Sequence, residues 1–349
     1  MSDIEKRKND HLDIVLDQES LLSGRTTGLE DIRFVHNALP ELDLAAIDLG
    51  TVFLDRPMAA PLIISSMTGG AARSASFNRR IAEACNALGL GFGVGSQRIA
   101  LEGKSDAGFE KELRKIAPNA PILANFGAAQ LTEWNGIDMA RRAVDMIEAN
   151  ALIIHLNPLQ EAVQPGGDTN WSGLLGKIEE ICSFSHVPIV CKEVGAGISG
   201  PVARRLTAAG VSVIDVAGSG GTSWVAVEAA RAATAAQKAI AAPFIDWGIP
   251  TARAIVEVRR DCPDIPLIAS GGIRDGLDCA KAIRLGADIV GLAASLLRSA
   301  MQDTAQLVEQ LEVMIAQLRI ACLCTGSADL DRLRRAPLLD PPAYIQGLE

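Results

Sequence analysis

The sequence predicts an α/β protein that folds as a (β/α)8 TIM barrel. Eight short apolar runs, each ending in small or polar residues, follow one another from Pro61 onward. The first four begin thirty residues apart, at Pro61, Gly91, Pro121 and Ala151, which leaves room for one helix between successive runs. Continuous apolar runs of this length are typical of strands buried on both faces. Eight strand–helix units close into a barrel whose active site lies at the carboxyl ends of the strands.

The predicted strands are residues 61–67, 91–96, 121–126, 151–157, 188–194, 211–218, 266–271 and 288–294. The segments between them have helical patterns. Residues 137, 140, 144 and 147 are apolar and lie on one face of a helix. Ser199, with a proline two residues later, suits a helix start, and Gly286 suits a left-handed helix end.

We expect residues 1–60 to form an extension that packs on the barrel, and residues 61–349 to form the barrel itself in a single domain. Residues 4–19 have the pattern of a short amphipathic helix. A long insertion follows the sixth strand, from Gly218 to Pro266, and such insertions usually shape or cover an active site. It contains an alanine-rich helix, and residues 243–248 are not counted as a strand because they would be the ninth. Residues 299–324 are expected to form one helix and residues 329–339 a basic tail.

Composition limits the classes of partner. Of the 349 residues, 48% are hydrophobic but only 4% aromatic, so the core is expected to be aliphatic. A net charge of −9 argues against binding to nucleic acid. The charged start has no apolar stretch, and no run is long enough to span a bilayer, so we expect neither a signal peptide nor a membrane partner. Seven cysteines without a Cys-x-x-Cys motif predict reduced thiols and a cytoplasmic location.

Two glycine-rich segments at the ends of the last two strands predict a phosphate site. They are residues 270–275 and 291–295. Loops in these positions of a barrel often bind phosphate through backbone N–H groups, and small residues let the backbone approach the oxygens. The alternative is that glycine only relieves crowding at the barrel rim. Because two such segments occur in consecutive positions, we favour a phosphorylated ligand.

Uncharged polar residues at other strand ends suit a planar polar heterocycle in the same ligand. They are Ser66, Thr68, Ser96 and Asn125. Lys192 lies inside the fifth apolar run, where a charge is costly unless it is paired. It could stabilise the N1–C2=O edge of a reduced flavin, form an ion pair with a strand-end carboxylate, or form a Schiff base. Taken alone, the lysine does not separate these three roles.

The densest polar segment, residues 155–161, places an imidazole, two amides and a carboxylate on one strand-to-loop corner. These groups belong to His155, Asn157, Gln160 and Glu161. Glu161 could ligate Mg²⁺, which takes one or two carboxylates and completes its shell with water and substrate phosphates. Singly, a solvated acid and a satisfied histidine are the simpler interpretations. Because they would lie opposite a phosphate-bearing cofactor, the four residues together favour an active site.

A third group of residues is basic. Arg7, Lys8 and His11, together with Gln97 and Arg98, could bind a second anion, the substrate. Taken in isolation, a basic N-terminal run is usually only a solvated face.

These motifs resemble one family, the type 2 isopentenyl-diphosphate isomerases, which depend on FMN. The resemblance covers nearly the whole chain. It is carried by residues 7–11, 66–70, 95–98, 155–161, 192–195, 220–224 and 270–274. The run from His155 to Glu161 is the most specific, because other FMN barrels share the glycine loops but not this segment. Ser295 departs from the family pattern, in which a basic residue and proline are common, but backbone donors tolerate that change.

The resemblance implies a role for each matching residue. FMN contacts are implied for Ser66, Met67, Thr68, Ser96, Asn125, Lys192 and Thr222, with the FMN phosphate on Gly271, Gly272, Ile273, Arg274, Ala293 and Ala294. Substrate contacts are implied for Arg7, Lys8, His11, Ser96, Gln97, Arg98, His155, Asn157 and Gln160, with Mg²⁺ on Glu161. Gln160, His155 and Lys192 are the candidate catalytic residues.

The implied reaction interconverts isopentenyl and dimethylallyl diphosphate without net redox change. NADPH is expected to reduce the FMN, although no Gly-x-Gly-x-x-Gly fingerprint follows a strand. A homo-oligomer, a tetramer or an octamer, is also expected.

Two other functions compete with the isomerase. A 2-hydroxy-acid oxidase on the same barrel needs a histidine base near the late strands, whereas the four histidines, at 11, 36, 155 and 186, all precede residue 190. A barrel that binds phosphate without catalysis would not need so many polar strand ends.

Overall fold

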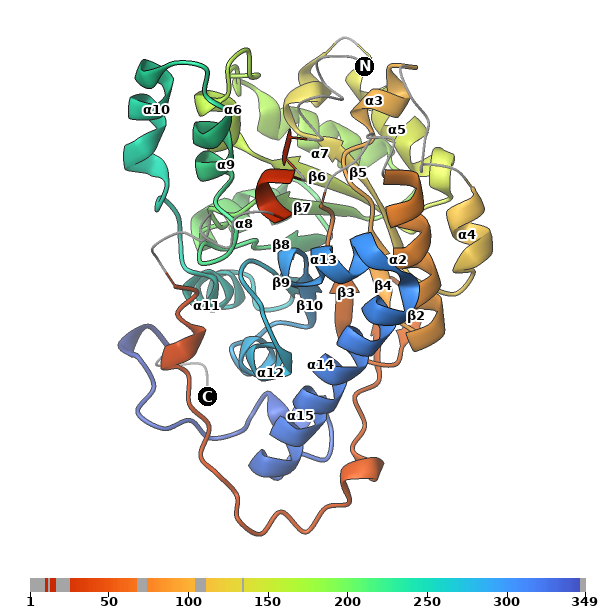
Figure 1. The fold of residues 1–349 in the computed structure, drawn as a ribbon, viewed down its shortest axis with the longest axis vertical. Coiled ribbons are helices and arrows are strands. Elements are labelled where there is room, and N and C mark those ends of the chain that lie inside the picture. The colour runs from red at the N-terminus through yellow and green to blue at the C-terminus, as the bar shows by residue number, and fades with distance from the viewer. Residues whose placement is uncertain are drawn as a thin grey trace.

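The computed structural model describes residues 10–11, 13–16, 26–67, 74–103, 111–133 and 135–345. Eight parallel strands close into a barrel in which the last strand pairs with the first (Figure 1). They are β3 (Leu62–Ile64), β4 (Gly91–Gly93), β5 (Ile122–Gly127), β6 (Ala151–Leu156), β7 (Ile189–Glu193), β8 (Val213–Asp215), β9 (Leu267–Ala269) and β10 (Ile289–Leu292). Each strand overlaps one of the eight apolar runs, so the predicted barrel is confirmed.

Helices surround the barrel. They are α2 (Ser74–Leu88), α3 (Arg98–Leu101), α4 (Glu112–Ile116), α5 (Gly136–Ile147), α6 (Pro158–Val163), α7 (Leu174–Phe184), α8 (Gly200–Ala208), α11 (Thr251–Asp261), α12 (Gly276–Arg284), α13 (Ala294–Gln302), α14 (Thr304–Thr325) and α15 (Leu330–Leu333). Helix α5 buries Ala140, Val144 and Ile147 on the face that the sequence predicts. Helix α12 is followed by Gly286 at φ 115°, the left-handed backbone expected there.

Two sets of apolar side chains form the core. One fills the space between the strands and the outer helices. The other fills the amino end of the barrel, where Ile63, Ile153 and Val190 point inward. The hairpin of β1 (Thr51–Phe53) and β2 (Arg56–Met58) adds Phe53 and Met58 to this second set. The hairpin therefore closes the amino end of the barrel, so in the described part of the chain a ligand of the barrel would enter at the carboxyl end.

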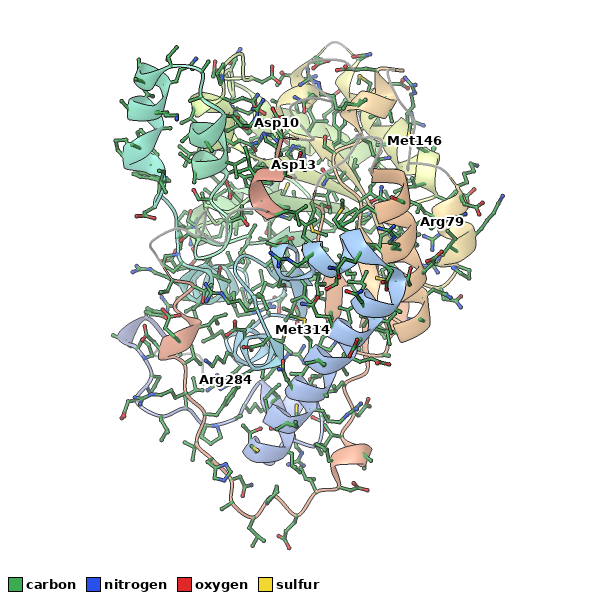
Figure 2. The ribbon with its side chains drawn as sticks, in the orientation of Figure 1. Asp10, Asp13, Arg79, Met146, Arg284 and Met314 are labelled. Carbon is green, nitrogen blue, oxygen red and sulfur yellow. The ribbon has the colours of Figure 1, made fainter. Side chains whose placement is uncertain are left out.

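The described part of the extension runs along the barrel beside the C-terminal segment (Figure 1). Phe34 bridges Leu338, Asp48 bridges Asp329, and Leu29 is fully buried in the core. Most of the helix expected over residues 4–19 lies outside the described residues. The part that is described is helical and carries Asp10 and Asp13, which lie close to the insertion (Figure 2).

The insertion after β8 contains α9 (Trp224–Arg231), α10 (Ala235–Ala241) and the 3-10 helix η5 (Ala242–Phe244). As expected, residues 243–248 form no strand. The prediction of one helix over residues 299–324 was wrong, because α13 ends before Asp303 and α14 begins after it. The Asp303 carboxylate accepts a hydrogen bond from the Gln306 N–H at 2.9 Å, and aspartate at this position favours a new helix start. No helix in the described part of the chain has both the length and the apolar character needed to cross a membrane.

Candidate active site

A cavity of about 1130 Å³ opens at the carboxyl ends of the strands, and residues that follow all eight strands line it. Most of the predicted site residues that the structure describes meet there. They are His11, Ser66, Met67, Ser96, Arg98, Asn125, His155, Asn157, Gln160, Glu161, Lys192, Thr222, Gly271, Gly272, Ile273, Arg274, Ala293 and Ala294. Arg7, Lys8 and Thr68, also predicted, lie outside the described residues.

Gln97 does not line the cavity, so the prediction that it contacts substrate needs correction. Its side chain is fully buried and points to the outer helices. Gln97 Nε2 donates to the Ala143 carbonyl at 2.9 Å, and Gln97 Oε1 accepts from the Asn125 N–H at 2.9 Å. Its neighbours Ser96 and Arg98 do line the cavity, whereas Gln97, the residue before α3, directs its side chain toward Ala143 of α5. Gln97 therefore holds Asn125 in place.

The phosphate end of the cavity, residues 271–274 and 293–295, is built from backbone. Gly271 (φ 103°) and Gly272 (φ 72°) have conformations that favour glycine, and a Cβ on Gly271 would collide with the backbone of Gly218. Helix α13 begins here with no side chain capping it, and Ala293 and Ala294 line the cavity. Free N–H groups at a helix start attract an anion.

Buried hydroxyl groups beside the phosphate end lack partners. The Oγ atoms of Ser65, Ser66 and Ser295 are buried without a hydrogen bond, and all three residues line the cavity. An unpaired buried hydroxyl costs free energy, so a polar ligand in this position would satisfy it. Together with the glycine cradle, these atoms fit a phosphorylated cofactor.

Three polar residues stand side by side on neighbouring strands. His155 on β6 is in register with Lys192 on β7, which is in register with Asp215 on β8. His155 Nδ1 lies 2.7 Å from Asn125 Oδ1, and Lys192 Nζ donates to the Glu193 carbonyl at 2.6 Å. Burial raises the pKa of the Asp215 carboxyl, although the charge of Lys192 opposes the shift. Asp215 was not among the predicted residues, although a charge inside an apolar run is the same signal that drew attention to Lys192.

Glu193, which was also not among the predicted site residues, shapes the loop after β7. Its buried carboxylate accepts hydrogen bonds from the N–H groups of Val194, Gly195, Ala196 and Gly197, at 2.6, 2.6, 2.5 and 3.2 Å. Burial raises the pKa of this carboxyl, and the hydrogen bonds oppose the shift. The loop therefore keeps a fixed shape beside Lys192, and Val194 and Gly195 line the cavity.

The β6 corner, residues 155–161, is held by side chains. Asn157 Nδ2 donates to Glu161 Oε1 at 2.9 Å. Gln160 Nε2 donates to Glu228 Oε1 at 3.2 Å, and the same oxygen lies 2.9 Å from His11 Nε2. Glu228, on α9, thus joins the N-terminal segment to the corner.

The charged form of Glu228 is stabilised by its partners. Burial raises its pKa, but the hydrogen bond and charge of His11, with Gln160 and Arg231, outweigh burial and lower it. An acid in an alanine-rich helix was the only sequence signal for this residue.

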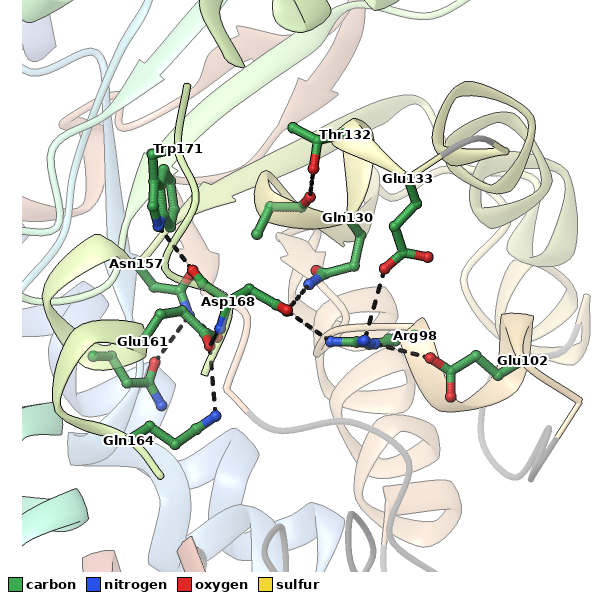
Figure 3. Close-up of polar contacts among 12 residues, drawn as sticks. Arg98, Glu102, Gln130, Thr132, Glu133, Asn157, Glu161, Gln164, Asp168 and Trp171 are labelled. Atoms are coloured by element: carbon green, nitrogen blue, oxygen red, sulfur yellow. Dashed lines mark hydrogen bonds and ion pairs between the residues drawn. The ribbon is translucent and has the colours of Figure 1, made fainter. Parts of the chain in front are cut away.

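Arg98 lies in a network of carboxylates at the edge of the cavity (Figure 3). Arg98 Nε is 2.8 Å from Glu102, Nη1 is 3.1 Å from Asp168, and Nη2 is 3.7 Å from Glu133. Burial lowers the pKa of Arg98, but the hydrogen bond to Glu102 and the charges of the three acids outweigh burial. The pKa of Arg98 is therefore raised above its usual value. Asp168 also accepts from Gln130 Nε2 at 2.9 Å. Neither Asp168 nor Gln130 was predicted.

A metal would find one suitable carboxylate in the β6 corner, that of Glu161. In the described part of the chain, no three His, Cys, Asp or Glu residues are grouped to hold a metal ion. A single carboxylate fits Mg²⁺ only if water and ligand phosphates complete its shell.

Comparisons with known proteins agree with this geometry. Residues 148–340 match the family model described as FMN-dependent dehydrogenase. An isopentenyl-diphosphate delta-isomerase of Stutzerimonas stutzeri is 62% identical over 95% of this chain and 96% of its own length. One of Xanthobacter autotrophicus is 57% identical, over 95% of this chain and 97% of its own length. A crystallised mandelate oxidase variant superposes with a TM-score of 0.66 at 17% identity, over 98% of this chain and 100% of that chain, which supports the fold alone. With a closed barrel and relatives this similar, the chain belongs to the FMN-dependent family of isopentenyl-diphosphate delta-isomerases.

Proposed function

We propose that this protein interconverts isopentenyl and dimethylallyl diphosphate, with reduced FMN bound in the cavity. The observation that carries the proposal is the meeting, in one cavity, of the phosphate end and the β6 corner. The names of the similar proteins support the same reaction. The reaction adds a proton at one carbon and removes a proton from another, so it needs no net oxidant.

The cofactor is assigned to residues around the phosphate end. The backbone of residues 271–274 and the start of α13 would hold the FMN phosphate, while Ser66, Asn125 and Lys192 would face the polar part of the ring. When bound and reduced, FMN supplies a proton-carrying nitrogen and an electron-rich face. The Lys192 ammonium, nearly buried, would favour negative charge beside it.

The substrate is assigned to the β6 corner. Arg98, His155 and Asn157 would hold the diphosphate together with Mg²⁺ on Glu161. Gln160, fixed by its hydrogen bond to Glu228, would place the alkene. Binding the charged end firmly lets that binding energy orient the reacting carbons. NADPH as reductant belongs to the same proposal.

The likeness to mandelate oxidase does not favour oxidation of a 2-hydroxy acid. The sequence has no histidine after residue 186, and β9 and β10 therefore supply no imidazole base.

Product analysis tests the proposed function. The purified protein should show a flavin spectrum and convert isopentenyl diphosphate when both Mg²⁺ and NADPH or dithionite are present. Chelation of the metal, or FMN left oxidised, should abolish turnover. Full activity with oxidised FMN, or oxygen consumption with lactate or glycolate instead of isomerisation, would overturn the proposal.

A further inference from the structure

Asp168 contacts three residues of the cavity wall without lining the cavity itself. Its carboxylate accepts hydrogen bonds from Arg98 and Gln130, at 3.1 and 2.9 Å, and its backbone N–H donates to Glu161 Oε2 at 2.8 Å (Figure 3). Arg98, Gln130 and Glu161 all line the cavity. Asp168 therefore contacts both Arg98, the cation proposed to bind the diphosphate, and Glu161, the carboxylate proposed to bind its metal ion.

The charge around Arg98 is unfavourable for an additional anion. Three carboxylates, those of Glu102, Glu133 and Asp168, share this one guanidinium. A diphosphate that approached the group as it stands would meet more negative than positive charge, and like charges brought together weaken binding. Release of one of these acids would therefore strengthen the contact between Arg98 and the substrate.

Asp168 is the acid best placed to leave. Glu102 is one helical turn from Arg98, and its side chain is 21% exposed, whereas that of Asp168 is 44% exposed and lies in the loop between α6 and α7. The side chain of Glu133 is 42% exposed and lies 3.7 Å from Arg98, but its departure would leave the Asp168 N–H on Glu161 Oε2. The neighbouring Gly166 has φ 71°, with open space around it. Movement of this loop would also uncover Glu161, because a Cβ on Gly167 would collide with Glu161 and the Asp168 N–H covers Oε2.

We propose that Asp168, from outside the cavity, holds Arg98 and Glu161 in the resting protein, and that the metal-bound diphosphate takes over both groups and displaces Asp168 from them in one step. The inference rests on the proposed function for its ligand. It couples metal binding to substrate binding through one residue, because both contacts of Asp168 are lost together. Trp171 Nε1 donates a hydrogen bond to the Asp168 carbonyl at 2.9 Å. This bond lies within the loop, so Asp168 and Trp171 would move together.

Calorimetry with inorganic pyrophosphate and Mg²⁺ on the FMN-loaded protein tests the competition. Asp168→Asn keeps the shape but removes the charge, so pyrophosphate should bind about fivefold more tightly than to the wild type. Asp168→Glu restores the charge and should return the affinity to within about twofold of the wild type. Glu133→Gln is the matched control: it removes a charge at a longer distance and with no link to Glu161, and its effect should stay within about twofold. Unchanged or weaker binding to Asp168→Asn would overturn the proposal.

A second measurement needs no variant. Hydrogen exchange over residues 162–172 of the wild type should become faster when Mg²⁺ and pyrophosphate bind, because the Asp168 N–H loses its acceptor. Slower or unchanged exchange would contradict displacement. Neither measurement uses turnover, so a protein that binds pyrophosphate as described but does not isomerise isopentenyl diphosphate would reject the proposed function and keep this inference. An active isomerase that lacks both the tighter binding to Asp168→Asn and the faster exchange would keep the proposed function and reject this inference.

Discussion

The two ends of the cavity differ in what they are made of. At the phosphate end, glycines with positive φ and an uncapped helix start present backbone atoms, and close packing against Gly218 leaves no room for a side chain on Gly271. At the β6 corner, the contacts run between side chains such as Gln160 and Glu228, and each group already has a partner. The first arrangement suits a cofactor that stays bound. The second suits a substrate that must enter and leave, because its partners can be exchanged.

The largest expected effect is at the phosphate end. Gly271→Ala should yield protein without flavin, because the added Cβ would collide with Gly218 and φ is 103°. Gly173→Ala is the control, since Gly173 has φ 73° but nothing within 4 Å of an added Cβ. The control should lose only about 1 kcal/mol of unfolding free energy and keep its flavin. The ratio of flavin to protein absorbance measures the result, and a fully yellow Gly271→Ala protein would contradict it.

Gln160→Ala breaks the β6 corner and should lower kcat about hundredfold, because the alkene loses its orienting group. Flavin content and pyrophosphate affinity should stay near the wild-type values, since Gln160 is assigned to neither task. Steady-state kinetics under reducing conditions check this. Turnover at the wild-type rate would remove Gln160 from the mechanism.

Metal binding sharpens the comparison further. Because Glu161 is a single carboxylate, Mn²⁺ as a probe should bind at least about tenfold more tightly with pyrophosphate than without it. Glu161→Gln should abolish that difference. Electron paramagnetic resonance of Mn²⁺ measures both, with protein-free samples that account for the complex of Mn²⁺ with pyrophosphate in solution. Equal affinity in the two conditions would point to a preformed metal cage.

The smallest effect concerns pH. The pKa of Glu228 is lowered in the folded protein, so its stabilisation is complete above the unfolded pKa and is lost as pH falls through the folded one. Glu228→Gln should cost about 1–2 kcal/mol near neutral pH, and the cost should shrink in acid. Urea unfolding of both proteins from about pH 7 to about pH 3 measures the difference. A cost independent of pH would mean that the charge of Glu228 contributes nothing.

The glycine loops of the phosphate end and the four polar residues of the β6 corner could be predicted from sequence to line the cavity, whereas the residues that contact that corner could not. Strands buried on both faces leave continuous apolar runs, and glycine loops at their ends have a local signature. The role of Asp168 depends instead on Arg98, 70 residues away, and that of Glu228 on His11, 217 residues away. Gln97 was misplaced because the turn from β4 into α3 directs its side chain toward α5, and the local sequence does not show that direction. Asp303 could have been identified as a helix start, but the apolar pattern continues through it.

The hairpin of β1 and β2 has a consequence for the order of events. Since Phe53 and Met58 fill the amino end of the barrel, every molecule must enter and depart by the same mouth. In the proposed arrangement, FMN at the phosphate end would load before the substrate, and a diphosphate bound at the β6 corner would hinder its release. Saturation with pyrophosphate should accordingly slow the release of flavin, so that the enzyme retains its coenzyme best when substrate is bound.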